Sequence, residues 1–221
     1  MINDQVADQS QEFSGYYDKP RLSLLALLSG HAPSHVLEIG CGGAANLLEM
    51  KRRHPACRTV GVDIRPEVAP LARSRVDAFH LGDIFAPKMS DSLGRDFDVV
   101  ILSHVLEHFP QPERVLALVR GLMRPGGELL VALPNVRHLS VVLDLVVSGD
   151  FRYTSSGILD HTHMRFFTRK SAERFLCAQG LHIDQIAADI EGPRSRLLDR
   201  LTLGAAREFA AFAYNFRLTL R

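Results

Sequence analysis

A glycine-rich turn after an apolar run is the first candidate for a ligand site in this sequence. Residues 40–45 read GCGGAA and follow VLEI, which fits the pattern G-x-G-x-x-G/A between a strand and a helix. Glycines there allow a tight turn and a close ligand approach, and the N-terminus of the following helix offers free N–H groups. Different nucleotide-like cofactors use this pattern, so the neighbouring residues must decide between them.

Three acidic residues indicate which kind of cofactor fits. Glu38 lies two residues before the first glycine, where a carboxylate suits a ligand that carries an ammonium and a sulfonium group. Asp63, in GVDI, is placed to accept hydrogen bonds from both hydroxyls of a ribose. Asp83, in GDIF, is placed to accept one from the amino group of an adenine. A pyrophosphate has no use for so many acids, whereas a cationic amino-acid nucleoside does.

The elements that must position these residues alternate between strand and helix. This order predicts a parallel sheet with helices on both faces and a ligand at the carboxyl ends of its strands. The predicted strands are residues 36–39, 59–62, 76–81, 97–102, 128–133, 183–190 and 209–220. The main predicted helices are residues 20–28, 44–53, 112–122, 136–147 and 168–179.

The successive motifs resemble those of class I S-adenosylmethionine-dependent methyltransferases. VLEIGCGGAANL, GVDI, GDIF, FDVVILSHVLEHFPQPERVL and LMRPGGELLVALPN follow one another in the family's order over residues 36–135. Residues 158–181, ILDHTHMRFFTRKSAERFLCAQGL, resemble a bacterial subgroup with a D-x-T-H-x-R-F-F-T-like segment, often found with glycan enzymes or in small-molecule pathways. Ala44 departs from the pattern, because the family often has glycine there, and the chain after residue 191 matches nothing.

The resemblance implies an α/β fold: a three-layer, doubly wound, Rossmann-like seven-stranded sheet, mostly parallel with the last strand antiparallel. It implies a single methyltransferase domain over residues 1–221, with an N-terminal arm and helix (1–30) and a substrate-side insertion (136–167). The implied cofactor is S-adenosyl-L-methionine. Its expected binding residues are Glu38, Gly40, Cys41, Gly42, Asp63, Ile64, Asp83, Ile84 and Ser103, with Tyr17 and Arg21 from the arm.

Histidines are the candidates for chemistry at the acceptor. Methyl transfer needs alignment of the reacting atoms, and a hydroxyl acceptor also needs a general base. His104 lies on the turn after the fourth strand, where it is expected to touch substrate or cofactor. His161 and His163, in DHTHMRFF, would point the same way if this run is extended, with Asp160 orienting one ring and Arg165 holding an acidic group. His163 is the favoured base, and its alternative role is a hydrogen bond that pins the loop.

A metal site is not expected from the sequence. Asp160, His161 and His163 could supply ligands, but the set is local and lacks a second carboxylate cluster. Glu107 and His108, in EHFP, are expected to shape a turn more than to take part in the chemistry.

Charge and cysteine content indicate which kinds of partner and which location to expect. A net charge of +1 offers no strong attraction to nucleic acid or to acidic membranes. The three cysteines are scattered and odd in number, which predicts free thiols in a reducing compartment and hence a cytoplasmic location. No membrane span is expected, and an oligomer is an open alternative.

The predicted reaction moves a methyl group to a hydroxyl, or to an amine, of a small molecule or glycan precursor. One alternative is an NAD(P)-dependent oxidoreductase. It would need a Tyr/Lys pair or a separate catalytic domain, and none of the lysines pairs with a tyrosine at helical spacing. The other alternative is a non-catalytic, methyltransferase-like partner subunit. The sequence carries no readable code for the acceptor.

Overall fold

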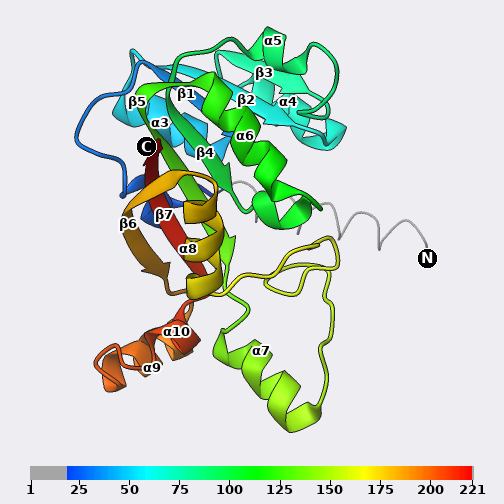
Figure 1. The fold of residues 1–221 in the computed structure, drawn as a ribbon, viewed down its shortest axis with the longest axis vertical. Coiled ribbons are helices and arrows are strands. Elements are labelled where there is room, and N and C mark those ends of the chain that lie inside the picture. The colour runs from blue at the N-terminus through cyan, green and yellow to red at the C-terminus, as the bar shows by residue number, and fades with distance from the viewer. Residues whose placement is uncertain (1–18, 221) are drawn as a thin grey trace.

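A seven-stranded sheet with the order β3-β2-β1-β4-β5-β7-β6 forms the centre of the molecule in this computed structural model, which describes residues 19–220 (Figure 1). β7 is antiparallel to both of its neighbours, and the remaining neighbouring pairs are parallel. The predicted fold class is therefore confirmed. The strands are β1 (His35–Ile39), β2 (Arg58–Asp63), β3 (Ala78–Leu81), β4 (Phe97–Ser103), β5 (Met123–Pro134), β6 (Leu181–Asp189) and β7 (Ala213–Leu220).

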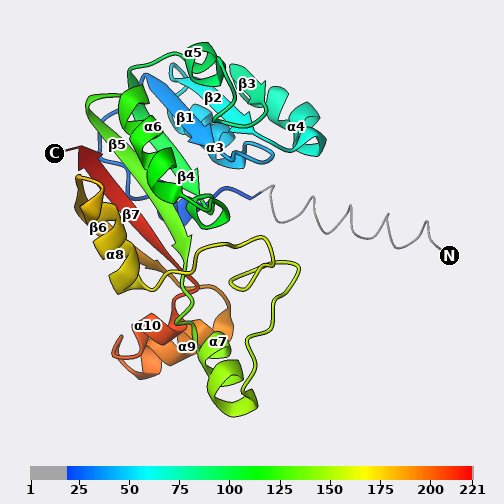
Figure 2. The same cartoon turned by 45° about the vertical axis from the view of Figure 1, so that its right-hand side comes forward.

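Helices cover both faces of this sheet. α6 and α8 lie on one face, and α3 lies on the other (Figures 1 and 2). The helices are α2 (Leu22–Leu25), α3 (Ala45–Arg53), α4 (Ala69–Arg73), α5 (Met89–Leu93), α6 (Pro112–Leu122), α7 (Leu139–Leu143), α8 (Arg169–Ala178), α9 (Pro193–Leu201) and α10 (Arg207–Ala210). Short helical turns of other types are η1 (Pro66–Val68), η2 (Leu106–His108) and η3 (Asp144–Ser148). None of the described helices is long and apolar enough to cross a bilayer.

β4 shows why the layers form. Its side chains alternate between the two faces of the sheet. Val100 and Leu102 join the cluster under α6 and α8, whereas Val99 and Ile101 join the cluster under α3. All four are buried, so the strand reads as a continuous apolar run. Burial of each such side chain stabilises the fold by roughly 1.5–3 kcal/mol.

The elements after β5 differ most from the predicted ones. The predicted helix at 136–147 is the short α7 followed by the wider turn η3, and this segment projects from the body of the molecule (Figure 1). α9 was missed, although Gly192 followed by Pro193 is a helix-start signal. The predicted strand at 209–220 begins only at Ala213, because the preceding residues form α10.

Asp98 ties the start of β4 to the loop before β1. Its buried carboxylate accepts hydrogen bonds from the backbone N–H groups of Ser34 and His35 and forms an ion pair with Arg124. We expect Asp98→Ala to lower the free energy of unfolding by about 2–4 kcal/mol, since it leaves buried donors unpaired. Urea unfolding measures this change. Asp91→Ala, at an exposed site on α5, is the control, and an equally small change in both variants would contradict the assignment.

Candidate active site

A cavity of about 600 Å³ opens at the carboxyl ends of β1, β2 and β4. The strand order reverses between β1 and β4, and ligands of open α/β sheets bind at such a switch point. Of the predicted cofactor residues, Tyr17 lies outside the described part of the chain. All the others line this one cavity: Arg21, Glu38, Gly40, Cys41, Gly42, Asp63, Ile64, Asp83, Ile84 and Ser103.

The turn after β1 depends on the lack of a side chain at Gly40. The N–H groups of Gly40 and Cys41 both donate to the carbonyl of Val62, which folds the chain sharply against β2. Gly40 has φ of +69°, and a Cβ built there would lie 2.5 Å from Cγ2 of Val105. Ala44 holds a left-handed conformation, φ +60°, which explains why glycine would also fit its place.

Glu38 is the most unusual acid in the cavity. It is 2% exposed, its Oε1 accepts a hydrogen bond of 2.7 Å from Asn46, and its Oε2 has no partner among the described residues. Burial raises the pKa of Glu38 to about 8, the hydrogen bond from Asn46 partly offsets this rise, and the charge of Asp63 adds to it. An unpartnered buried carboxylate oxygen fits a cationic ligand. Sequence reasoning missed Asn46, whose Oδ1 also accepts from the N–H of Arg21.

Asp63 is already saturated with donors. Oδ2 accepts from the N–H of Gly42 at 2.7 Å, and the guanidinium of Arg65 donates to both carboxylate oxygens at 3.0 and 3.1 Å. The backbone N–H of Arg65 donates to Oδ1 as well. Arg65 was not among the predicted site residues, yet its guanidinium occupies both oxygens of the carboxylate that is expected to bind the ribose.

Two of the predicted residues, both isoleucines, contribute to the apolar lining of the cavity. Ile64 is 66% exposed and Ile84 is buried, and both line the cavity. Asp83 lies beside Ile84, two residues after the end of β3, and its Oδ1 accepts from the N–H of Phe85. Apolar side chains next to a carboxylate that a backbone N–H holds in place suit an adenine ring.

His104 follows β4 in a strained conformation. Its φ is +55°, an uncommon value for a residue other than glycine, and strain of this kind clusters at functional sites. Its N–H donates to the carbonyl of Ala132. The ring lines the cavity, with Nδ1 3.4 Å from Oε1 of Glu107 and Nε2 buried without a partner among the described residues.

The loop that carries the other two histidines is not extended. The N–H of His163 donates to the carbonyl of Asp160, so the run turns back, and His161 and His163 face different surroundings. His161 is exposed and lines the cavity. The ring of His163 is 6% exposed, does not line the cavity, and donates from Nδ1 to the carbonyl of Ile158.

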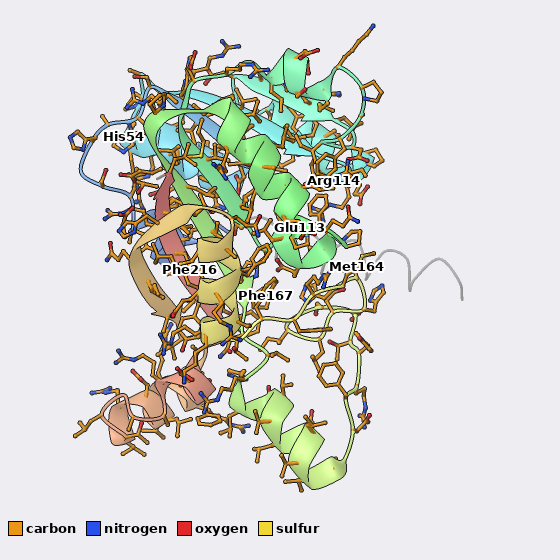
Figure 3. All side chains as sticks on the ribbon, viewed as in Figure 1. His54, Glu113, Arg114, Met164, Phe167 and Phe216 are labelled. Carbon is orange, nitrogen blue, oxygen red and sulfur yellow. The ribbon has the colours of Figure 1, made fainter. Side chains whose placement is uncertain are left out.

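Arg165 has a different place from the predicted one. Its guanidinium donates to the carbonyl of Pro110, and the N–H groups of Met164 and Arg165 donate to the carbonyl of Glu107. Figure 3 shows Met164 in the loop below the end of α6, where Glu113 and Arg114 are labelled. Arg165 therefore fastens the loop to the turn after β4 and is not available for an acidic ligand.

His108 and Thr162 join the cavity wall, and sequence reasoning gave them no binding role. Nδ1 of His108 lies 3.0 Å from the hydroxyl of Thr162, which donates to Asp160. Burial lowers the pKa of His108, and the charge of Glu107 opposes this change. A threonine in an irregular loop carries no pattern that reveals such a contact in advance.

Comparisons with known proteins decide the family. A family model described as a methyltransferase domain matches residues 11–186. The chain belongs to this methyltransferase-domain family. The unpartnered oxygen of Glu38 offers a partner to the positively charged cofactor that the sequence resemblance implies. The oxidoreductase alternative loses its support.

Named relatives of this methyltransferase are distant. The ubiquinone biosynthesis O-methyltransferase of Aeromonas salmonicida is 29% identical over 71% of the chain, which spans 65% of that relative's length. The corresponding protein of Cupriavidus pinatubonensis is 28% identical over 86% of the chain and 78% of its own length. A SAM-dependent methyltransferase from Archaeoglobus fulgidus shares the fold, with a TM-score of 0.58, 19% identity, and coverage of 97% of this chain and 93% of its own.

Proposed function

We propose that this methyltransferase transfers a methyl group from S-adenosylmethionine to a hydroxyl of a small molecule. The observation that carries the proposal is that one cavity holds two groups whose buried polar atoms have no partner among residues 19–220. They are Oε2 of the buried carboxylate Glu38 and Nε2 of the half-buried imidazole His104. The first suits a cationic donor, and the second suits proton removal from an acceptor. The names of the relatives support an oxygen acceptor, and a glycan precursor is one member of the substrate class.

Residues at the carboxyl ends of β1 and β2 would hold the donor. When bound, S-adenosylmethionine supplies a methyl group on a positively charged sulfur. Glu38 would pair with the ammonium end, the turn at Gly40 would let the ligand approach the backbone, and Asp63 would take the ribose hydroxyls in place of the Arg65 guanidinium. Asp83 and Ile64 would position the adenine.

His104, rather than His163, takes the role of general base in this proposal. The sequence pattern favours His163, but that ring does not line the cavity, and its Nδ1 donates to the carbonyl of Ile158. His104 lines the cavity, and its Nε2 has no partner among residues 19–220. His161, exposed at the rim, would contact the acceptor.

The His104→Gln variant tests this role. We expect kcat for a hydroxyl acceptor to fall about 10²- to 10⁴-fold, because general base catalysis is lost. Donor affinity measured by calorimetry should stay within about threefold, because the donor is held by other residues. His54→Gln is the matched control, since His54 lies at the end of α3, far from the loop that carries Met164 (Figure 3).

Two outcomes would contradict the proposal. Unchanged kcat in His104→Gln would remove His104 as the base. Turnover of amines but of no hydroxyl compound, in a screen with labelled donor, would replace the oxygen acceptor by nitrogen. A cytoplasmic location remains part of the proposal, supported by the free thiols of Cys41, Cys57 and Cys177.

A further inference from the structure

Three side chains beside the cavity converge without a role in the proposed reaction. Glu107, His108 and His163 each offer one ligand atom, and these atoms all lie within 4.8 Å of one another. We propose that these residues bind a divalent transition-metal ion that activates the acceptor hydroxyl. This inference rests on the proposed function for the role of the ion, although the binding of the ion can be tested alone.

Glu107 has the environment of a ligand. It is 0% exposed, and neither oxygen of its carboxylate accepts a hydrogen bond from any residue in the range 19–220. Burial of an ionised carboxylate costs several kcal/mol unless a partner compensates it. The backbone of Glu107 is fixed, because its carbonyl accepts two N–H groups from the loop at Met164 and Arg165. Nδ1 of His104 lies 3.4 Å from Oε1, and a bound cation would supply the further partner that both oxygens need.

Both imidazoles present the nitrogen that a metal needs. Nδ1 of His163 faces the carbonyl of Ile158 at 3.0 Å, so it carries the proton and leaves the Nε2 lone pair free. Nδ1 of His108 faces the hydroxyl of Thr162 at 3.0 Å, and this hydroxyl gives its own proton to Asp160. Metal-binding histidines are oriented in this way by hydrogen bonds from their second ring nitrogen.

The distances favour a single shared ion. Nε2 of His163 lies 3.9 Å from Oε1 of Glu107, and the rings of His108 and His163 meet edge to face with centroids 4.8 Å apart. Two atoms that each bind an ion at about 2.0–2.2 Å lie 3–4.4 Å apart, depending on the angle between them. The cluster therefore needs only small side-chain adjustments to close around an ion.

The ligand types select the metal. Two imidazoles and one carboxylate suit Zn²⁺ and neighbouring first-row ions, whereas Mg²⁺ and Ca²⁺ prefer oxygen ligands. Three protein ligands leave a further coordination position, and His108 lines the cavity. An acceptor hydroxyl bound there would lose its proton more readily. Its O–H bond breaks toward the base, the oxygen forms a bond to the methyl carbon, and the carbon–sulfur bond breaks with its electron pair left on sulfur.

The proposed site differs from the local set Asp160, His161 and His163, from which no metal site is expected on the sequence alone. Of the three ligands considered there, Asp160 is committed to Thr162 and His161 is exposed at the rim. Only His163 belongs to the cluster. Its partners come from η2, more than fifty residues earlier, and the fold alone brings them together.

Zinc binding to the chelator-treated full chain tests the site. We expect one equivalent of Zn²⁺ to bind in competition with a chromophoric chelator and to raise the melting temperature. Glu107→Gln and His163→Asn should each weaken this binding at least 100-fold. His161→Asn should bind zinc like the wild type, because His161 lies outside the cluster. Donor binding, followed by calorimetry without metal, shows whether each variant is folded.

Each result supports or overturns the proposal. Absence of stoichiometric zinc binding by the wild type, equal binding by Glu107→Gln, or equal affinity for Mg²⁺ would overturn the site. Full turnover by the metal-free enzyme would overturn the role of the ion while leaving the proposed methyl transfer intact. If the wild type binds zinc but does not bind the donor, the proposed function is wrong and the metal site still stands. The two failures are therefore distinguishable.

Discussion

Donor affinity is expected to rise about 100-fold between pH 5.5 and pH 7.5, close to tenfold per pH unit. The cause is Glu38, whose pKa is raised to about 8 by burial. In the free protein most of this carboxyl is protonated over this range, and a cationic donor prefers the ionised form. Binding therefore releases a proton, and affinity grows as pH approaches the pKa of the free site. Calorimetry in two buffers of different ionisation enthalpy counts the released proton.

Glu38→Gln is the decisive variant for this expectation. It should weaken donor binding at neutral pH and remove the pH dependence. The exposed Glu67→Gln should keep both properties of the wild type. The same pKa predicts a pH dependence of stability. Between pH 4.5 and about 8 the Glu38 carboxyl is protonated in the folded free protein and ionised in the unfolded chain. The free energy of unfolding should therefore fall as pH rises through this range. If donor affinity in Glu38→Gln depends on pH as it does in the wild type, Glu38 is not the titrating group.

Gly40→Ala is expected to weaken donor binding by about two orders of magnitude and to lower the free energy of unfolding by about 2–3 kcal/mol. A Cβ at this position would lie 2.5 Å from Cγ2 of Val105, and φ of +69° adds strain. The turn or Val105 must move, and either movement displaces the backbone that lines the cavity. Calorimetry and urea unfolding measure the two effects.

Two further variants separate the collision of the added Cβ with Val105 from the strain of the positive φ at residue 40. Gly149 has a similar φ of +64°, but nothing lies within 4 Å of its added Cβ, so Gly149→Ala should show the strain alone, about 1 kcal/mol. Adding Val105→Ala to Gly40→Ala should restore part of the donor affinity, because it removes the colliding methyl group. No recovery in the double variant would mean that the collision is not the cause.

Much of the fold could be predicted because its signals are local. β4 reads as an apolar run whose alternate residues face two helix layers, and α6 begins at Pro112, a residue suited to the first helical turn. The glycine turn, Glu38 and Asp63 could be found for the same reason, since each lies within a few residues of the strand end that positions it. α9 was not predicted because its apolar positions, such as Leu197 and Leu201, are few and remain exposed, and α10 has only four residues, too few for a periodic pattern.

The order of the residues by itself determined the parallel sheet, the position of the cofactor turn and the acids around it, because strand ends carry their side chains to one edge. Only the tertiary structure decided how the histidines divide. A turn at Asp160 buries His163 against Glu107 and leaves His161 at the rim, while the strained backbone of His104 places its ring in the cavity wall. The loop at Met164 and Arg165 contacts η2, which lies more than fifty residues earlier in the chain. No local sequence pattern predicts a contact over that separation.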